Sequence, residues 1–277
     1  MTTELSTINT EIVLTEQQIA EMIAAEMASD RDANAFQFLP SRIKMPSGSP
    51  PYAFASGDEF MKTFTATIIV SQIARAYWPG KDTQGLPPVC SSPDGMVGWL
   101  ADSIDEEQSK VAIAQYPAHP GLHTVNAERG PYACNRCPLA AWGTGSGRGQ
   151  ACKSLRRLLL LVDGWSMPVI LTLPPTSTRV FDDFASARQS KGKAYFACRI
   201  EFSLEEKKNA SGIRYAAVKL TKLDELSNAD LSVVLSMRVQ FTELVRNMEI
   251  TAAEYETAPV AEDTQSARSE RPNDVPF

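Results

Sequence analysis

The chain has 277 residues, of which 43% are hydrophobic and 22% are charged, and its formal net charge is −6. It is long and apolar enough to form a folded core. Its longest apolar run, 158–162, is far shorter than the ~20 residues that cross a bilayer. Its acidic start also lacks the basic and apolar regions of a secretion signal. These features exclude a membrane protein, a collagen and a wholly disordered chain, and they predict a cytoplasmic protein.

The charge is unevenly distributed along the chain. Residues 1–35 hold seven acidic residues and one basic residue, and residues 250–277 hold six acidic and two basic ones. The remaining segment, 36–249, therefore carries +4. An acidic head and an acidic tail flank a mildly basic body, and this asymmetry says more about partners than the net charge does.

The N-terminal segment, 1–35, is predicted to contain one short amphipathic helix at 15–28. Thr15 and Gln18 form a start like a capping box. Apolar residues then recur at helical spacing: Ile19, Met22, Ile23 and Met27.

The segment 36–225 is predicted to form a β-rich core. Residues 62–78 are rich in β-branched and aromatic residues with partial alternation, which indicates a long, bent strand. Residues 79–154 have frequent proline and glycine and little periodicity, so we interpret them as an insertion, with a short strand at 111–116. Four of the five cysteines lie in this insertion.

Regular patterns return after the insertion. Two β-hairpins are predicted, the first formed by 155–162 and 167–173 around an Asp-Gly turn, the second by 193–204 and 213–220. A helix over 176–190 separates them.

The chain is predicted to end in a helix at 226–249 and a disordered acidic tail at 250–277. Ser227 with Asp230 provides the start of the helix. Its expected apolar face consists of Leu231, Val234, Leu235, Val239, Phe241 and Leu244.

The order strand, insertion, strand, strand, helix, strand, strand is that of an OB-fold. The sequence therefore predicts a mainly β protein with α-helices: a five-stranded OB-fold barrel carrying a metal-binding insertion, with N- and C-terminal helices.

The cysteine spacing predicts a structural zinc site. Cys134 and Cys137 form a C-x-x-C pair, which presents two thiolates to one ion, and Cys152 follows fifteen residues later. An insertion without a periodic apolar face needs another source of order, and a metal ion supplies it. Cys90 is the favoured fourth ligand.

The cysteine pattern leaves two alternatives open. His119 or His123 could replace Cys90 as the fourth ligand, and the C-x-x-C pair could be a redox motif or simply exposed. Cys198 lies in a predicted strand and is expected to be a buried core residue.

Aromatic and basic side chains are interleaved along the core, as single-strand binding requires, because flat rings stack on bases and cations neutralise phosphates. About half of the aromatic residues are expected to pack in the core instead. The candidate DNA contacts are Arg75, Tyr77, Trp78, Arg136, Trp142, Arg148, Lys153, Arg156, Lys193, Tyr195, Arg214 and Tyr215.

The last four residues carry a more specific resemblance. Asp274, Val275, Pro276 and Phe277 resemble the Asp-Ile-Pro-Phe tip of bacterial single-stranded DNA-binding proteins. In that family the tip ends an acidic tail and recruits replication and repair enzymes. The resemblance implies a protein-docking role for these four residues.

A second resemblance covers more of the chain. Residues 88–95, followed by Cys134-x-x-Cys137-Pro138, Gly143 and Cys152-Lys153, resemble phage and mobile-element proteins encoded near recombination and replication genes. A metal site inserted into an OB-fold is similar to the T4-type phage single-stranded DNA-binding proteins. Those use one histidine and three cysteines, so four cysteines here would be a departure.

Together these observations predict a non-enzymatic protein that coats single-stranded DNA in phage or mobile-element replication, recombination or repair, in the cytoplasm and nucleoid of a bacterial host. The alternative is a zinc-containing adaptor that binds replication or transcription proteins without touching DNA. A zinc hydrolase is disfavoured, because four thiolates leave no open coordination position. The helix at 15–28 could cap the barrel or join copies of the chain into a homo-oligomer.

Overall fold

The computed structural model describes residues 40–46, 50, 52–78, 88–101, 130–145, 149–208, 212 and 214–251, together with residues 15, 21, 22 and 25. The chain divides into two units, 1–39 and 40–277. In the first unit, residues 21, 22 and 25 are helical. The rest of the predicted helix, the predicted strand at 111–116, both histidines and the tail from residue 252 lie outside the described residues.

A long strand, β4 (Thr63–Tyr77), organises the second unit. Residues 66–70 of β4 are all buried, and this nearly continuous run of small and β-branched residues suits a strand that is covered on both faces. It pairs antiparallel with β8 (Cys152–Val162) from residue 66 to residue 77, and a bulge between Ile68 and Val70 interrupts the register. This bulge bends the strand, as the sequence pattern predicts.

One edge of the sheet continues from β8. β9 (Val169–Leu173) pairs antiparallel with β8 through a turn at Gly164, whose φ of 80° favours glycine. β1 (Arg42–Ile43) then adds to β9 in parallel. A separate hairpin, β2 (Phe54–Ser56) with β3 (Glu59–Met61), lies between β1 and β4 in the chain.

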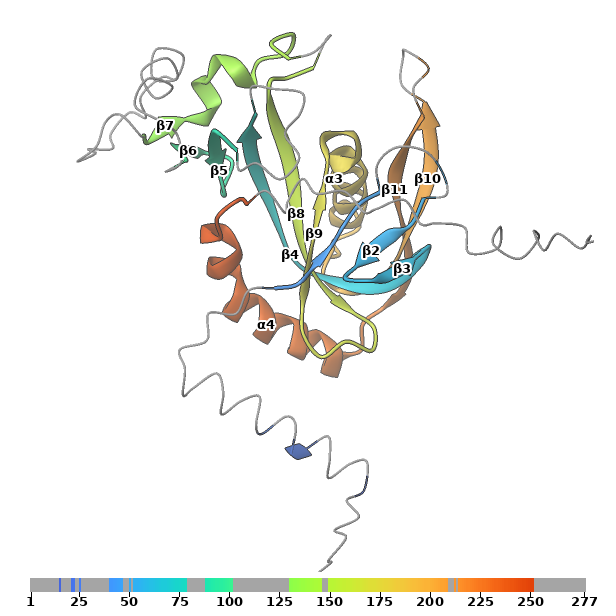
Figure 1. The fold of residues 1–277 in the computed structure, drawn as a ribbon. Coiled ribbons are helices and arrows are strands. Elements are labelled where there is room, and N and C mark those ends of the chain that lie inside the picture. Colours follow the sequence, from blue (N-terminus) through green and yellow to red (C-terminus); the bar gives the residue numbers. More distant parts are fainter. Residues whose placement is uncertain are drawn as a thin grey trace, which may run out of the picture. The chain divides into compact units, whose positions relative to one another are not determined.

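The other edge of β4 carries two branches, one at each end (Figure 1). Thr63–Ala66 pair with β10 (Cys198–Lys208), which forms a hairpin with β11 (Arg214–Glu225). Arg75–Tyr77 pair with β5 (Cys90–Ser92).

From β5 the second branch continues through β6 (Val97–Leu100) to β7 (Tyr132–Ala133). Two short 3-10 helices follow, η1 (Cys134–Arg136) and η2 (Pro138–Ala140). The strands β5–β7, η1, η2 and the chain that follows as far as Cys152 together form what we call the cysteine insertion.

Two helices pack on the strands. α3 (Pro175–Gln189) contacts β11, β8 and β9, while α4 (Asn228–Asn247) contacts β4 (Figure 1). The Ser227 hydroxyl accepts a hydrogen bond from the Asp230 backbone N–H and caps α4, as predicted. Arg238 of α4 donates a hydrogen bond to the Ile69 carbonyl oxygen at the bulge. No helix in the described part of the chain is long and apolar enough to cross a membrane.

The main core lies on one face of the sheet. Aliphatic residues of β8 and β9 meet three aromatic rings there: Phe64 stacks on Phe202 at 4.8 Å between ring centroids and meets Phe54 edge to face at 5.0 Å. Phe181 of α3 closes this core. Burial of such residues is the main stabilising contribution to the fold.

The prediction of a mainly β protein with α-helices is confirmed, but the expected closed barrel is wrong. The free edge of β9 pairs with β1 rather than with β11. α3 packs along β11, where the Ser177 hydroxyl accepts the Val218 backbone N–H at 3.3 Å. Because the helix and β1 occupy the two edges that would have to meet, the sheet stays open.

Two further details differ from the sequence prediction. Residues 193–197 form an irregular segment with a turn rather than a strand, since the Lys193 N–H and the Ala194 carbonyl oxygen bond back to Arg188. On α4 the buried residues are Val234, Phe241 and Val245, whereas Leu235 and Val239 are exposed.

Candidate metal centre

Three separate segments bring the four insertion cysteines together. Cys90 begins β5, Cys152 begins β8, and Cys134 and Cys137 lie in and directly after η1. β4 lies between the first two, because Tyr77 pairs with Cys90 on one side and with Cys152 on the other. Directly opposed residues share a face of the sheet, so both thiols project from the same face.

All four cysteines line one cavity of about 10 Å³. That is about the room that one water-sized sphere needs. Gly98 of β6 closes one wall, since a Cβ atom there would lie 3.3 Å from the Cys90 Sγ and 3.4 Å from the Cys134 Sγ. The cavity is lined by Arg75, Cys90, Ser91, Ser92, Gly98, Tyr132, Cys134, Cys137, Ala140 and Cys152.

A tight turn before β6 holds this arrangement in place. The Asp94 carboxylate accepts hydrogen bonds from the Ser92 hydroxyl at 2.9 Å and from the Met96 and Val97 backbone N–H groups at 2.8 and 3.0 Å. The Cys134 N–H then donates to the Met96 carbonyl oxygen at 3.0 Å. The C-x-x-C segment is thereby fixed to the β5–β6 hairpin.

Burial and mutual repulsion shape the electrostatics of the four thiols. Burial raises the pKa of Cys152 to about 12; the nearby Arg75 charge opposes the rise, and the other cysteines add to it. Burial, followed by repulsion from the other three cysteines, raises the pKa of Cys90 as well. Burial also raises the pKa values of Cys134 and Cys137. The four sulfurs are close enough to sense one another's charge.

The donor set fits a closed, four-coordinate zinc ion, which favours four thiolates in one pocket. As the side chains stand, however, no group of three or more histidine, cysteine, aspartate or glutamate side chains in the described ranges is arranged to hold a metal ion.

The fifth cysteine lies elsewhere. Cys198 is fully buried at the start of β10, and its thiol donates to the Tyr195 carbonyl oxygen at 3.5 Å. It is a core residue, as predicted. His119 and His123, the alternative fourth ligands, lie outside the described residues. Cys90, the favoured fourth ligand, is among the residues that line the cavity.

Some of the candidate DNA contacts lie on or beside the cysteine insertion. Arg136 is exposed in η1, and Trp142, which follows η2, has 79% of its surface exposed. Lys153 is half-buried, with its Nζ donating to the Gln150 carbonyl oxygen. Trp78 is half-buried against a small cluster that includes Leu155 and Ile250. Tyr77 is half-buried against Cys90, Leu100 and Tyr132.

A hydrogen-bonded loop presents Trp142. The Thr144 hydroxyl donates to the Ala141 carbonyl oxygen at 2.7 Å and accepts the Ala151 N–H at 3.1 Å. The Gly143 N–H donates to the Gly149 carbonyl oxygen at 3.0 Å. The tryptophan is therefore held outward by its backbone.

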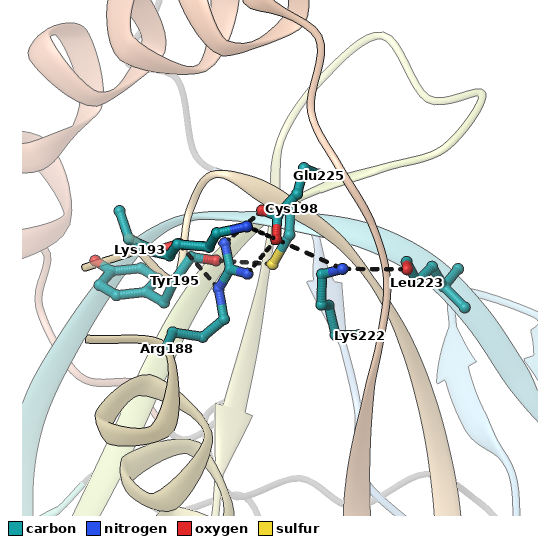
Figure 2. Close-up of polar contacts among 8 residues, drawn as sticks. Arg188, Lys193, Tyr195, Cys198, Lys222, Leu223 and Glu225 are labelled. Atoms are coloured by element: carbon teal, nitrogen blue, oxygen red, sulfur yellow. Dashed lines mark hydrogen bonds and ion pairs between the residues drawn. The ribbon is translucent and has the colours of Figure 1, made fainter. Parts of the chain in front are cut away.

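The remaining candidates are engaged elsewhere. Arg156 forms an ion pair with Asp182 and lies over the Phe181 ring at 5.0 Å. Lys193 pairs with Glu225 at 3.0 Å in the network shown in Figure 2. Arg214 pairs with Glu206.

Tyr195 and Tyr215 also lie away from the cysteine insertion. The Tyr195 hydroxyl bonds Arg238, and Tyr215 is half-buried opposite Lys207. Arg148 lies outside the described residues. The candidates within the described residues thus do not form one surface.

The structure adds two residues that the sequence reasoning missed: Trp99, which is 48% exposed on β6, and Gly98, which closes the cavity. Arg75, a candidate DNA contact, instead lines the cavity. The sequence does not mark Trp99 as exposed, because residues 97–100 are all apolar or glycine and show no apolar–polar alternation. Nothing in the sequence marks Gly98, because its role depends on the neighbouring strand.

Comparison of the chain with protein-family models, with curated proteins and with solved structures found no match.

Proposed function

We propose that this protein binds single-stranded DNA through a zinc-stabilised insertion, and that it coats DNA during phage or mobile-element replication, recombination or repair. The observation that carries this proposal is that one segment, residues 130–145, contributes two cysteines to the shared cavity and also presents the exposed Arg136 and Trp142. A metal ion bound in the cavity would order this segment, and would thereby fix the positions of the Arg136 cation and of the Trp142 ring on which a base can stack.

The strand pairing supports an OB-like core. In an OB-fold the first strand pairs with the second and the fourth, the second pairs with the third, and the fourth pairs with the fifth. The strands β4, β8, β9, β10 and β11 make these four pairings in the same chain order, with α3 between the third and fourth. The pairing between third and fifth is missing, and OB-folds are partly open barrels.

Zinc as a structural ion is supported by the donor set. Cys90, Cys134, Cys137 and Cys152 would hold it with no open position, so its role would be to order the insertion rather than to activate water. This is consistent with a binding protein.

The position of α4 favours the insertion over the open sheet as the contact surface. Residues 157–160 of β8 are all buried, and because they alternate between the two faces of the strand, both faces of the sheet are covered there. Arg157 is buried and bonded to the chain just after α4. Bases could not stack on this part of the sheet without moving the helix, whereas Trp99 and Trp142 are already exposed.

Partner recruitment through residues 274–277 is part of the proposal. These residues lie outside the described part, so this element rests on the sequence resemblance and on the acidic character of 250–277.

Metal analysis of the purified protein tests the first half of the proposal. We expect one zinc per chain by native mass spectrometry. Cys90→Ser should lower the zinc content, whereas the matched variant Cys198→Ser removes an equally buried thiol outside the cavity and should leave it unchanged. A metal-free, well-folded wild type would contradict the zinc centre.

Binding of fluorescent poly-dT at two salt concentrations tests the second half. A binder that neutralises phosphates must weaken as salt rises. The competing function is an adaptor that binds another protein, and it is favoured by the exposed apolar Met96, Trp99 and Trp142 on the insertion. Zinc content without poly-dT binding at low salt would select the adaptor.

A further inference from the structure

Arg75 occupies an unusual position for an arginine. It lies on β4, two residues before Tyr77, and lines the same cavity as the four cysteines. Its Nη1 atom is buried and has no hydrogen-bond partner in the described structure. A buried donor without a partner costs about 1–3 kcal/mol, so its retention calls for a physical reason.

The strand register aims this side chain at the sulfurs. Arg75 pairs with Ser92 on one side and with Ser154 on the other. These positions are two residues along from Cys90 and Cys152, and residues two apart in a strand share a face. The guanidinium group therefore projects on the same side as the two thiols that flank Tyr77.

No neighbouring carboxylate explains the arginine. Asp94 belongs to the same hairpin, but its carboxylate is bonded to the Ser92 hydroxyl and to two backbone N–H groups. Across the residues that the structure describes, Arg75 forms no ion pair with an acidic side chain. The sulfurs line the same cavity as its side chain, and the guanidinium group lies within hydrogen-bond reach of the Cys152 thiol.

Four thiolates around one Zn²⁺ carry a net charge of −2, which is costly in a buried pocket. We propose that Arg75 is the positioning residue of this centre: it donates N–H hydrogen bonds to the metal-bound sulfurs and cancels one negative charge. The proposal rests on the zinc centre proposed above and adds a residue that is not a ligand. It implies that Arg75 sets both how tightly the ion is held and how reactive its thiolates are.

The test compares Arg75→Met, Arg75→Lys and Arg179→Met in the zinc-loaded full chain. Arg179 is an exposed arginine on α3 whose loss removes the same charge far from the cavity. Zinc affinity is measured by competition with a chromophoric chelator, and thiolate reactivity by the rate of modification with a disulfide reagent. Circular dichroism confirms that each variant is folded.

We expect Arg75→Met to weaken zinc binding about 10- to 100-fold, the range typical of residues that support metal ligands, and to speed thiol modification. Arg75→Lys keeps the charge but loses the planar donor fork, so it should fall between Arg75→Met and the wild type. Arg179→Met should match the wild type in both measurements.

The outcomes separate the two proposals. A wild type that retains no zinc overturns the metal centre and this inference with it. A wild type with one zinc, together with an Arg75→Met variant that equals Arg179→Met, overturns the role of Arg75 alone. Should Arg75→Met fail to fold, Arg75→Lys decides, and wild-type affinity with a wild-type modification rate in that variant would overturn the inference.

Discussion

Arg157, in the middle of β8, donates a hydrogen bond of 2.7 Å to the backbone carbonyl oxygen of Met248, just after the end of α4. A second bond, of 3.2 Å, reaches the carbonyl oxygen of Glu249. The last carbonyl groups of a helix lack partners within it, and a cation near them is favourable. Arg157 thus joins the C-terminal end of α4 to the sheet. Ile250, which follows these hydrogen-bonded residues in the chain, packs in a small cluster with Leu155.

Arg157→Met should therefore destabilise the protein by about 2–4 kcal/mol, because it removes both hydrogen bonds that a fully buried guanidinium group makes to the end of α4. Urea denaturation followed by circular dichroism measures the change. The matched variant Arg246→Met removes an exposed arginine that pairs with Glu243 on α4, and it should cost no more than about 0.5 kcal/mol. Equal effects of the two variants would contradict the anchoring role of Arg157.

The sequence predicts the elements of the core better than their assembly. β4, the first hairpin and α3 fall within a few residues of the predicted ranges, because they are long and their patterns are regular. The prediction of a closed barrel was wrong because a two-residue strand, β1, pairs with β9, and because α3 packs along β11. Strand pairing between distant segments leaves no local pattern to read.

The candidate site shows the same difference between local features, which the sequence predicts, and contacts between distant segments, which it does not. The spacing of Cys134, Cys137 and Cys152 predicts which thiols meet, since a metal-ligand motif is local. The favoured place of Cys90 depends on the pairing of β5 with β4, which the sequence does not encode locally. Arg75 and Gly98 have ordinary sequence surroundings, and only the three-dimensional packing assigns them to the cavity.

The ion pair between α3 and β11 makes stability depend on pH. Arg188 donates to both carboxylate oxygens of Glu225, at 2.6 and 2.7 Å, and Lys193 donates at 3.0 Å (Figure 2). The hydrogen bond from Arg188, followed by that from Lys193, holds the pKa of Glu225 below its ordinary value. The pair therefore contributes stability above the unfolded pKa of about 4.3, and loses it as the pH falls through the lower folded pKa.

Glu225→Gln should accordingly cost about 1 kcal/mol at pH 7, a modest figure because Glu225 is partly exposed. The difference from the wild type should shrink as the pH falls below about 4. Urea denaturation at pH 7 and pH 3 measures both values. Glu243→Gln, which removes an exposed pair on α4, is the control and should have little effect at pH 7. A Glu225→Gln difference that stays constant between the two pH values would contradict the linkage.

Gly98→Ala should weaken zinc binding without unfolding the core. The added Cβ atom would meet the Cys90 and Cys134 sulfurs at 3.3 and 3.4 Å, so the sulfurs must shift. We expect about a tenfold loss of zinc affinity, measured by chelator competition. Gly57→Ala is the control: it strains a backbone with φ of 57° in open space, away from the cavity, and should leave zinc affinity unchanged. Unchanged affinity in Gly98→Ala would mean that the sulfurs do not converge beside β6.

Trp142→Ala should weaken poly-dT binding by about 1–3 kcal/mol, the contribution of one stacked base, which is about 5- to 150-fold in affinity. Because no cation is lost, the dependence of binding on salt should keep its slope, whereas Arg136→Met should lower the slope by about one. Fluorescence anisotropy at several salt concentrations gives both quantities. Val239→Ser changes an equally exposed apolar residue on α4 and should bind like the wild type. If Trp142→Ala binds poly-dT as tightly as Val239→Ser does, the strand does not stack on the insertion, and its exposed tryptophans are better explained as a protein-docking surface.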